Sequence, residues 1–134
     1  MIVVDTNVIA YLYLPGERSE QASQALQKDP MWVAPLLWRS EFRSALTLYV
    51  RKQRLALADA QEIMEESLRL MSGRECEPAS SHVLRLAAES RCSAYDCEFV
   101  ALAQDMDVPL VTVDRQVLTE FSELAVLLDD YIAA

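Results

Sequence analysis

Four carboxylates carry the chemistry that this sequence suggests: Asp5, Glu41, Asp96 and Asp114. The first and the last each follow an apolar run, residues 1–4 and 108–113, and the other two fall on segments with helical periodicity. Carboxylate oxygens without histidine or cysteine select Mg²⁺ or Mn²⁺ over zinc. Such an ion can polarise a phosphate group and activate a bound water molecule. The pattern therefore predicts a divalent metal site built from acids that lie far apart in the chain.

Taken singly, three of these acids have a purely structural explanation. Asp5 and Asp114 could each end a strand before the next helix, and Asp96 could face the dipole of a helix that Ser93 caps. Glu41 has no such explanation, because it falls inside the apolar arc of its helix, where an acid needs a partner. Two aspartates at one edge of a sheet would oppose folding unless a cation lies between them. We therefore interpret the four acids as one site.

The elements that position these acids alternate between short apolar runs and helical patterns. The predicted strands are residues 1–4, 31–34, 108–113 and 125–128, with a brief strand at Cys76. The predicted helices are residues 8–14, 19–27, 36–54, 59–71, 94–106 and 115–121, and one that runs from Ser80 or Ser81 to about 91. This alternation is typical of βαβ units and of a parallel sheet covered on both faces. Ligands bind at the carboxyl ends of the strands in such sheets.

The helix boundaries rest on capping residues. Asn7 is expected to cap the first helix, and Asp59 with Glu62 resembles a capping box at the start of the 59–71 helix. The segment after the last strand, with Asp129 and Asp130, is interpreted as an acidic tail. Glu98 lies about 200° from Asp96 around their helix, so we leave it outside the site.

The amino-acid composition excludes several classes of protein. The chain has 134 residues, 52% of them hydrophobic, and a net charge of −9, which suits a single globular domain and weighs against a broad basic surface for nucleic acid. Three cysteines and one histidine, without a C-x-x-C pair, make a disulfide scaffold or a zinc site an unfavourable interpretation. There is no apolar run of about 18 residues and no secretory signal pattern, so we expect a cytoplasmic protein that does not contact a membrane.

Four segments resemble the acidic motifs of the PIN-domain nucleases, and most closely those of the VapC-type toxins of bacterial toxin–antitoxin pairs. The segments are Val-Val-Asp5-Thr6-Asn7, Arg39-Ser-Glu41-Phe, Ser93-Ala-Tyr-Asp96-Cys-Glu-Phe-Val-Ala-Leu-Ala and Val111-Thr112-Val-Asp114. They occur in the family's order with natural spacing, and the resemblance covers essentially the whole chain.

The resemblance implies a three-layer α/β/α sandwich with a central, mainly parallel sheet, and a Mg²⁺- or Mn²⁺-dependent endoribonuclease. Metal-assisted attack of water with a leaving 3′ oxygen would give products with 5′-phosphate ends. By position, the four acids would be both the metal ligands and the catalytic acids. The supporting residues would be Thr6, Asn7 and Thr112. The family further implies an RNA substrate, a homodimer, and a small antitoxin whose C-terminal segment obstructs the acidic cleft.

Arg39 and Arg43 lie on the flank of the 36–54 helix and could guide the RNA backbone toward the acids. A solvated helix face with salt bridges to acidic neighbours explains the same two residues equally well. Neutralising both side chains separates these interpretations, since only RNA contacts would change the salt dependence of RNA binding.

Other functions fit parts of the pattern. A PIN fold with vestigial acids could serve as a non-catalytic binding or assembly module, and metal-dependent RNA cleavage would separate the two. A phosphoacceptor receiver domain also has an acidic Mg²⁺ pocket, but it needs a lysine at a late strand end, and this chain has only Lys28 and Lys52. Related folds also cut DNA flaps; chain length favours the small RNA-directed members.

Overall fold

The computed structural model describes residues 1–134 and contains one five-stranded sheet. The strands are β1 (Ile2–Val4), β2 (Trp32–Pro35), β3 (Glu75–Cys76), β4 (Leu110–Thr112) and β5 (Ala125–Leu127). They lie in the order β3-β2-β1-β4-β5, and every neighbouring pair is parallel. The chain builds outward from β1 on one side and then crosses to build on the other side. The strand order therefore reverses between β1 and β4, and this is the place where open parallel sheets bind ligands.

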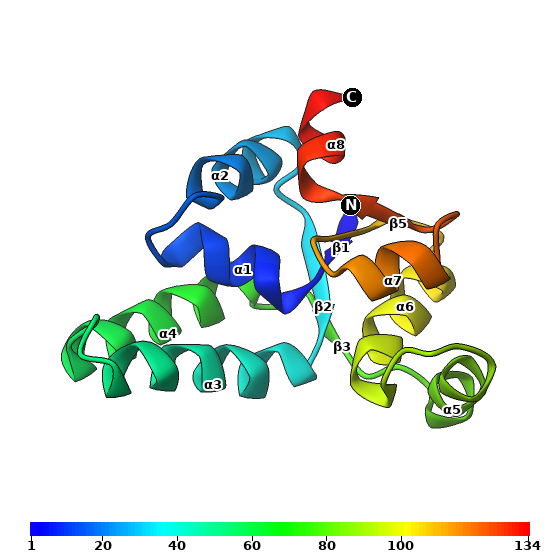
Figure 1. Cartoon of the computed structure of the whole chain (residues 1–134), viewed down its shortest axis with the longest axis horizontal. Coiled ribbons are helices and arrows are strands. Elements are labelled where there is room, and N and C mark those ends of the chain that lie inside the picture. Colours follow the sequence, from blue (N-terminus) through cyan, green and yellow to red (C-terminus); the bar gives the residue numbers. More distant parts are fainter.

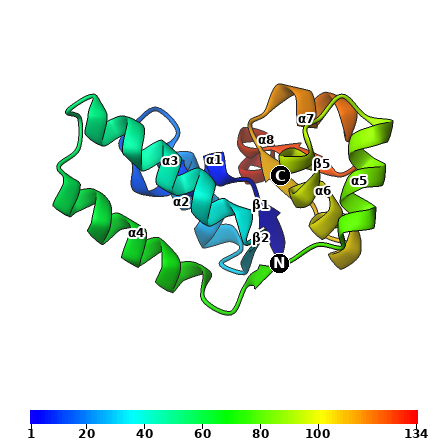
Figure 2. The same cartoon turned by 90° about the horizontal axis from the view of Figure 1, so that it is seen from below.

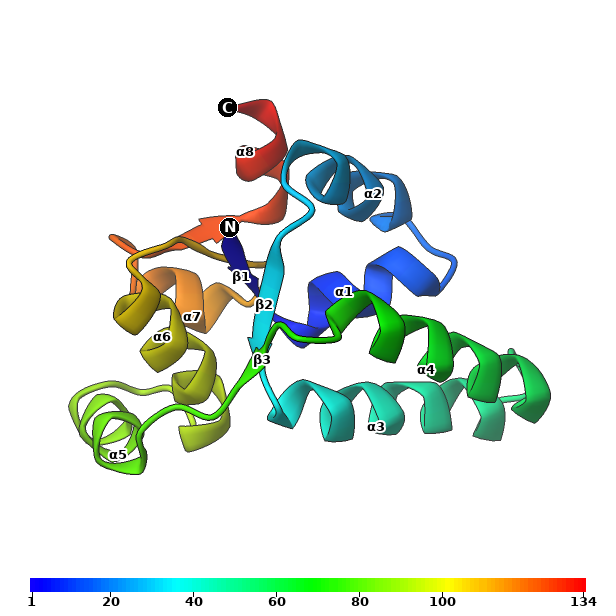
Figure 3. The same cartoon turned by 180° about the vertical axis from the view of Figure 1, so that it is seen from behind.

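Eight helices surround the sheet. They are α1 (Thr6–Tyr13), α2 (Ser19–Lys28), α3 (Leu37–Arg51), α4 (Leu57–Met71), α5 (Ser80–Glu89), α6 (Ala94–Met106), α7 (Arg115–Glu120) and α8 (Leu128–Ala133). Helices α1 to α4 lie on one side of the sheet and α5 to α7 on the other (Figure 1, Figure 2). The three-layer arrangement predicted from the sequence is confirmed. The pair α3–α4 forms a hairpin that extends away from the sheet (Figure 3).

The short apolar runs become strands because helices cover the sheet on both faces. All residues of β1, β2 and β4 are buried, and all of them except Pro35 and Thr112 belong to one core of 30 hydrophobic residues. A strand buried on both faces reads as a continuous apolar run and not as an alternating one. A polar residue in such a strand is then conspicuous. Thr112, fully buried at the end of β4, is one of only four buried polar or charged residues in the chain.

Helix starts differ from the predictions in three places. Asp5, and not Asn7, caps α1, and Asn7 lies inside that helix. Helix α4 begins at Leu57 after Ala56, so Asp59 lies in its first turn and forms no capping box. Neither Ser80 nor Ser81 caps α5, because the cap position is Ala79, which has no side-chain acceptor. Helices α4 and α5 therefore begin without a side-chain cap, and each packs on the rest of the fold through buried residues such as Met71 and Val83.

The segment predicted as an acidic tail is instead the helix α8, which packs against α2. Leu128 is fully buried, and Lys28 of α2 donates hydrogen bonds to the backbone oxygens of Tyr131 and Ala134. The ammonium group of Lys28 also lies 4.3 Å from the centre of the Tyr131 ring. The two aspartates lie in the first turn of α8, where negative charge is favourable.

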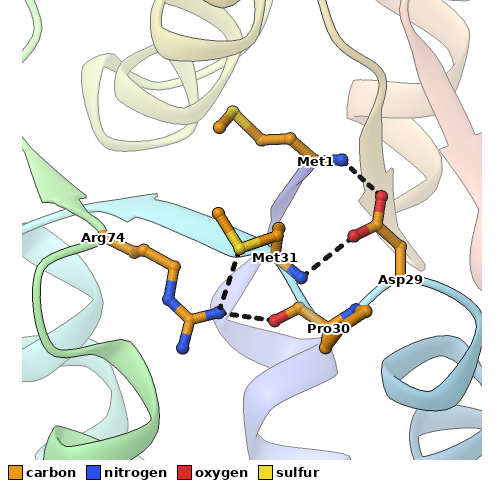
Figure 4. A network of polar contacts seen from close by, with 5 residues as sticks. All are labelled: Met1, Asp29, Pro30, Met31 and Arg74. Atoms are coloured by element: carbon orange, nitrogen blue, oxygen red, sulfur yellow. Dashed lines mark hydrogen bonds and ion pairs between the residues drawn. The ribbon is translucent and has the colours of Figure 1, made fainter.

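The amino ends of the strands are tied together by polar contacts at the edge opposite the acids (Figure 4). The Asp29 carboxylate accepts hydrogen bonds from the amino group of Met1 and from the backbone N–H of Met31. The Arg74 guanidinium donates to the backbone oxygens of Pro30 and Leu70. These contacts fix the turn that leads into β2. None of the eight helices combines the length and the apolar character that crossing a bilayer requires.

Candidate active site

Asp5 lies directly after β1, at the point where the strand order reverses. Its backbone N–H donates to the oxygen of Val111 on β4, which fixes it between the two central strands. Its Oδ1 accepts from the backbone N–H of Thr6 (2.8 Å) and its Oδ2 accepts from the hydroxyl of Thr112 (2.7 Å). The residue is only 9% exposed. Asp5 is therefore both the cap of α1 and a carboxylate held in one orientation.

Asp114 follows β4 by two residues and belongs to the same edge of the sheet. Its Oδ1 accepts from the backbone N–H groups of Gln116 (2.9 Å) and Val117 (3.1 Å), so it caps α7. Its own backbone N–H donates to the Thr112 hydroxyl at 3.0 Å. One threonine thus donates to the Asp5 carboxylate and accepts from the Asp114 backbone. The amide nitrogen of Asn7 also lies 3.5 Å from this hydroxyl.

Glu41 reaches the site from α3. Its neighbours Trp38 and Phe42 are fully buried, which places Glu41 at the border of the apolar face, as its periodicity predicts. Its Oε1 accepts a hydrogen bond of 2.7 Å from the Thr6 hydroxyl at the start of α1. An acid on an apolar face needs a polar partner, and the Thr6 hydroxyl is that partner. Thr6 therefore links Glu41 to Asp5 through its hydroxyl and its backbone N–H.

Asp96 comes from the opposite side of the sheet, in the first turn of α6. The Ser93 hydroxyl accepts from the Asp96 backbone N–H at 3.1 Å, which confirms Ser93 as the predicted cap. Cys92 and Cys97 occupy the positions on either side of this cap that often pack together as a hydrophobic staple, and both are buried. The cysteines thus have the structural role of small apolar residues. The first turn of α6, and Asp96 with it, is fixed by local interactions.

The charges of the four acids act on one another. Burial raises the pKa of Asp5 to about 6, and the charges of Asp96 and Glu41 add to this effect, against hydrogen bonds from Thr112 and Thr6. The pKa values of Glu41 and Asp96 are also raised, first by burial and then by the charges of Asp96 and Asp114 respectively. The acids are therefore near enough to repel one another, and a cation among them would relieve the repulsion.

The donor set suits a hard cation. All four side chains offer oxygen, and the side-chain oxygen of Asn7 is a buried acceptor without a partner inside the protein. No three acidic, histidine or cysteine side chains are close enough together to surround one ion directly. Mg²⁺ is usually held by only one or two carboxylates and keeps several waters, so the set fits this ion without a complete protein cage. A direct ligand role for all four acids stays a prediction.

Comparison with known sequences decides the family. The model of the PIN domain family matches residues 2–126. This chain belongs to the PIN-domain family. It is 32% identical over 127 residues to Ribonuclease VapC3 from Pyrobaculum aerophilum, and the match covers 92% of this chain and 96% of that protein. The family predicted from the acidic motifs is thereby confirmed.

Solved structures confirm the PIN fold. The crystal structure of PAE2754 from Pyrobaculum aerophilum matches 98% of this chain and 86% of its own with a TM-score of 0.78 and 21% identity. FitAcB from Neisseria gonorrhoeae matches 95% of this PIN domain and 96% of its own chain with a TM-score of 0.69 and 20% identity. At these identities the likeness concerns the fold, and the chemistry of the site depends on its own residues.

Arg39 of this PIN domain is engaged in a structural ion pair. Its Nε and Nη2 donate to the two carboxylate oxygens of Glu75 on β3, at 2.6 and 2.5 Å, and the indole N–H of Trp38 donates to the same carboxylate at 2.7 Å. The Glu75 side chain is 9% exposed. The network ties the first turn of α3 to the edge of the sheet. Arg43 is exposed, so it is the member of the predicted RNA-binding pair whose charge faces solvent.

Replacing Arg39 with alanine is therefore expected to destabilise the PIN domain by about 1–3 kcal/mol, because the nearly buried Glu75 carboxylate loses its charged partner. Arg43→Ala is the matched control and should change the free energy of unfolding by less than about 0.5 kcal/mol. Urea unfolding of both variants measures the difference. Equal stability of the two variants would mean that the ion pair contributes nothing and that Arg39 remains available for RNA.

Glu98, which the sequence analysis left outside the site, has one of the motif acids as a neighbour. The pKa of Glu98 is raised by burial and then by the charges of Glu77 and Glu41, so Glu98 lies near one of the four motif acids. The helical angle separated Glu98 from Asp96 on α6, but Glu41 belongs to α3 and approaches from another direction. No pattern within one helix could have shown this neighbour.

Proposed function

We propose that this PIN domain is a ribonuclease that depends on Mg²⁺ or Mn²⁺ and hydrolyses RNA phosphodiester bonds. The observation that supports the proposal is the hydrogen-bond network at the reversal of strand order, where Thr6 joins Glu41 to Asp5 and Thr112 joins Asp5 to Asp114. The charge of Asp96 acts on Asp5 and on Glu41. The similarity to Ribonuclease VapC3 over nearly the whole chain supports the choice of RNA as substrate.

The residues of the site would have different roles in this reaction. Asp5, at the end of β1, and Asp96, in the first turn of α6, would hold the divalent ion, with Glu41 and Asp114 completing its surroundings. When bound, such an ion polarises the phosphate, lowers the pKa of a bound water for attack, and stabilises the leaving oxygen. Thr112 and Thr6 would keep the carboxylates in place through their hydrogen bonds. The only histidine, His82, contacts Gln104 and Asp105, so we assign it no part as a base.

The proposal extends to partners. By its similarity to VapC-type proteins, the domain would act in the cytoplasm as a homodimer and as the toxin of a toxin–antitoxin pair. The acidic site and the net charge of −9 would favour an inhibitor segment rich in arginine or lysine. Copurification with the product of an adjacent reading frame, and its displacement by high salt, would test this part.

The function is tested by incubating the purified protein with single-stranded RNA in Mg²⁺, in Mn²⁺ and in excess EDTA. We expect cleavage with either ion, none in EDTA, and products with 5′-phosphate ends that a 5′-phosphate-dependent exonuclease then degrades. The control is the Asp96→Asn variant, which keeps the fold of α6 because Ser93 still caps the helix. Metal-dependent cleavage retained by this variant would reject the role assigned to Asp96. Cleavage by neither protein, with intact fold, would favour a non-catalytic PIN module.

A further inference from the structure

Tyr95 is the one aromatic side chain that the fold leaves exposed. It is 63% exposed, whereas the other nine aromatic residues are buried or partly buried. The helix that carries it, α6, is otherwise the most deeply packed helix of the molecule, with Phe99 at 1% and Leu102 at 4% exposure. Burial of its own ring therefore does not explain the presence of a tyrosine at this position.

The place of Tyr95 in the fold is specific. It directly precedes Asp96 in the first turn of α6, and neighbouring Cα atoms are only about 3.8 Å apart. The same turn lies at the carboxyl edge of the sheet, where the charge of Asp96 acts on Asp5 and Glu41. The side chains of Tyr95 and Asp96 leave α6 about 100° apart, so the exposed ring lies on the surface one residue from an acid of the group and not inside the group.

RNA has one group that the acids could bind through a metal ion and another that the Tyr95 ring could contact. A nucleotide has an anionic phosphate, which an ion held by the acids would bind, and a flat base attached to the same sugar. Aromatic side chains stack on the bases of single-stranded nucleic acid, and every base has a face that permits this. A strand with its scissile phosphate at the acids therefore has bases within reach of Tyr95.

We propose that Tyr95 is a substrate-binding residue that stacks on the base of a nucleotide next to the scissile phosphate. The inference rests on the proposed ribonuclease function and names a residue that its metal chemistry does not require. Tyrosines are also common at protein interfaces, so a protein partner is the alternative occupant. RNA is favoured because Tyr95 lies one residue from an acid of the group, and because Tyr95 is the only large hydrophobic residue of α6 that is exposed.

The test compares Tyr95→Ala, Tyr95→Leu, Tyr95→Phe and Tyr95→Trp in steady-state cleavage of a short single-stranded RNA at fixed Mg²⁺. Loss of stacking should raise KM by about 5- to 150-fold in the alanine and leucine variants, with kcat nearly unchanged. The phenylalanine and tryptophan variants, which keep a ring, should recover most of the affinity. The matched control is Leu57→Ala, since Leu57 is 62% exposed but lies at the far end of α3–α4.

A spectroscopic measurement adds a readout that a structural role would not change. The fluorescent base 2-aminopurine, placed on either side of the mapped cleavage site, should be quenched by the wild-type protein at one of the two positions. Tyr95→Ala should abolish this quenching, and Tyr95→Trp should restore it. Circular dichroism melting establishes that each variant is folded.

Any one of four results would overturn the inference. An unchanged KM for Tyr95→Ala, an equal loss for Tyr95→Ala and Tyr95→Phe, or equal quenching with and without the ring would each do so. Altered self-association of Tyr95→Ala with unchanged RNA affinity would overturn it in favour of a protein interface. If the wild-type protein does not cleave RNA at all, the proposed function itself fails, and that result is distinct from the other outcomes.

Discussion

The Asp5→Asn variant should lose metal-dependent RNA cleavage and yet be more stable than the wild-type protein when no metal is present. Asparagine keeps an oxygen that can accept from the Thr6 backbone N–H and an amide that can contact Thr112, so the position remains hydrogen-bonded. It removes the negative charge that a divalent ion and a phosphate require. We expect cleavage to fall by at least about 10²- to 10³-fold, the range for loss of one electrostatic element of an active site.

The gain in stability follows from the pKa of Asp5. Its value in the folded protein is raised from 3.8 to about 6, so the folded state binds the proton more tightly than the unfolded chain does. Ionisation of Asp5 therefore opposes folding; its cost is absent below about pH 3.8 and complete above about pH 6. At neutral pH this cost is about 3 kcal/mol, and the uncharged asparagine avoids it.

Urea unfolding of the two proteins between pH 4 and pH 8, in EDTA, measures the effect. The advantage of Asp5→Asn should grow as the pH rises to about 6 and stay constant above it. Added Mg²⁺ should stabilise the wild-type protein more than the variant, because binding to the folded state raises the free energy of unfolding. If the variant is less stable than the wild-type protein at pH 7.5, ionisation of Asp5 does not oppose folding. If the variant still cleaves RNA, the Asp5 carboxylate is not needed to bind a cation.

The sequence was sufficient to predict the central sheet and the edge at which Asp5 and Asp114 lie. Strands buried on both faces appear as continuous apolar runs, and the end of each run is marked by the polar residue that follows it. Asp5 and Asp114 could be recognised from the sequence as residues that end a strand, for this reason. The parallel arrangement followed from the alternation with helices, and parallel strands bring their carboxyl ends to one edge.

Features that depend on contacts across the fold could not be predicted in this way. The start of α4 at Leu57 and the existence of α8 depend on the apolar surfaces against which these helices pack. The engagement of Arg39 depends on Glu75, which comes from a two-residue strand 36 positions away. Local patterns give the type of a side chain and the face it occupies, but its partner is decided by elements that are distant in sequence.

Asp5 and Asp114 show how one residue type serves two purposes at this edge. Each caps the helix that follows its strand. Asp5 is nearly buried among like charges, whereas Asp114 accepts from two backbone N–H groups, where negative charge is favourable. Thr112 contacts both residues through one hydroxyl. One uncharged side chain therefore joins the two aspartates.

Replacing Thr112 with valine tests this dependence. Valine has nearly the same shape, so the buried position stays filled, but the Asp5 carboxylate loses its donor and the Asp114 backbone N–H loses its acceptor. Each unpaired buried group costs about 1–3 kcal/mol, and we expect a loss of stability in that range or somewhat above it. Cleavage should fall by about 10- to 100-fold, as for other residues that orient metal ligands, and a higher Mg²⁺ concentration should be needed for half-maximal rate.

Thr112→Ser is the matched control, because it keeps the hydroxyl and removes only a methyl group. It should lose about 1 kcal/mol of stability, the cost of a buried methyl group, and keep most of the cleavage rate and the Mg²⁺ dependence. If serine and valine reduce cleavage equally, packing and not the hydroxyl maintains the site. In the Asp5→Asn background the valine substitution should cost less stability than in the wild type, since part of its effect is the unpaired carboxylate. A double-mutant cycle over these two residues therefore measures how far the hydroxyl acts through Asp5 and how far through Asp114.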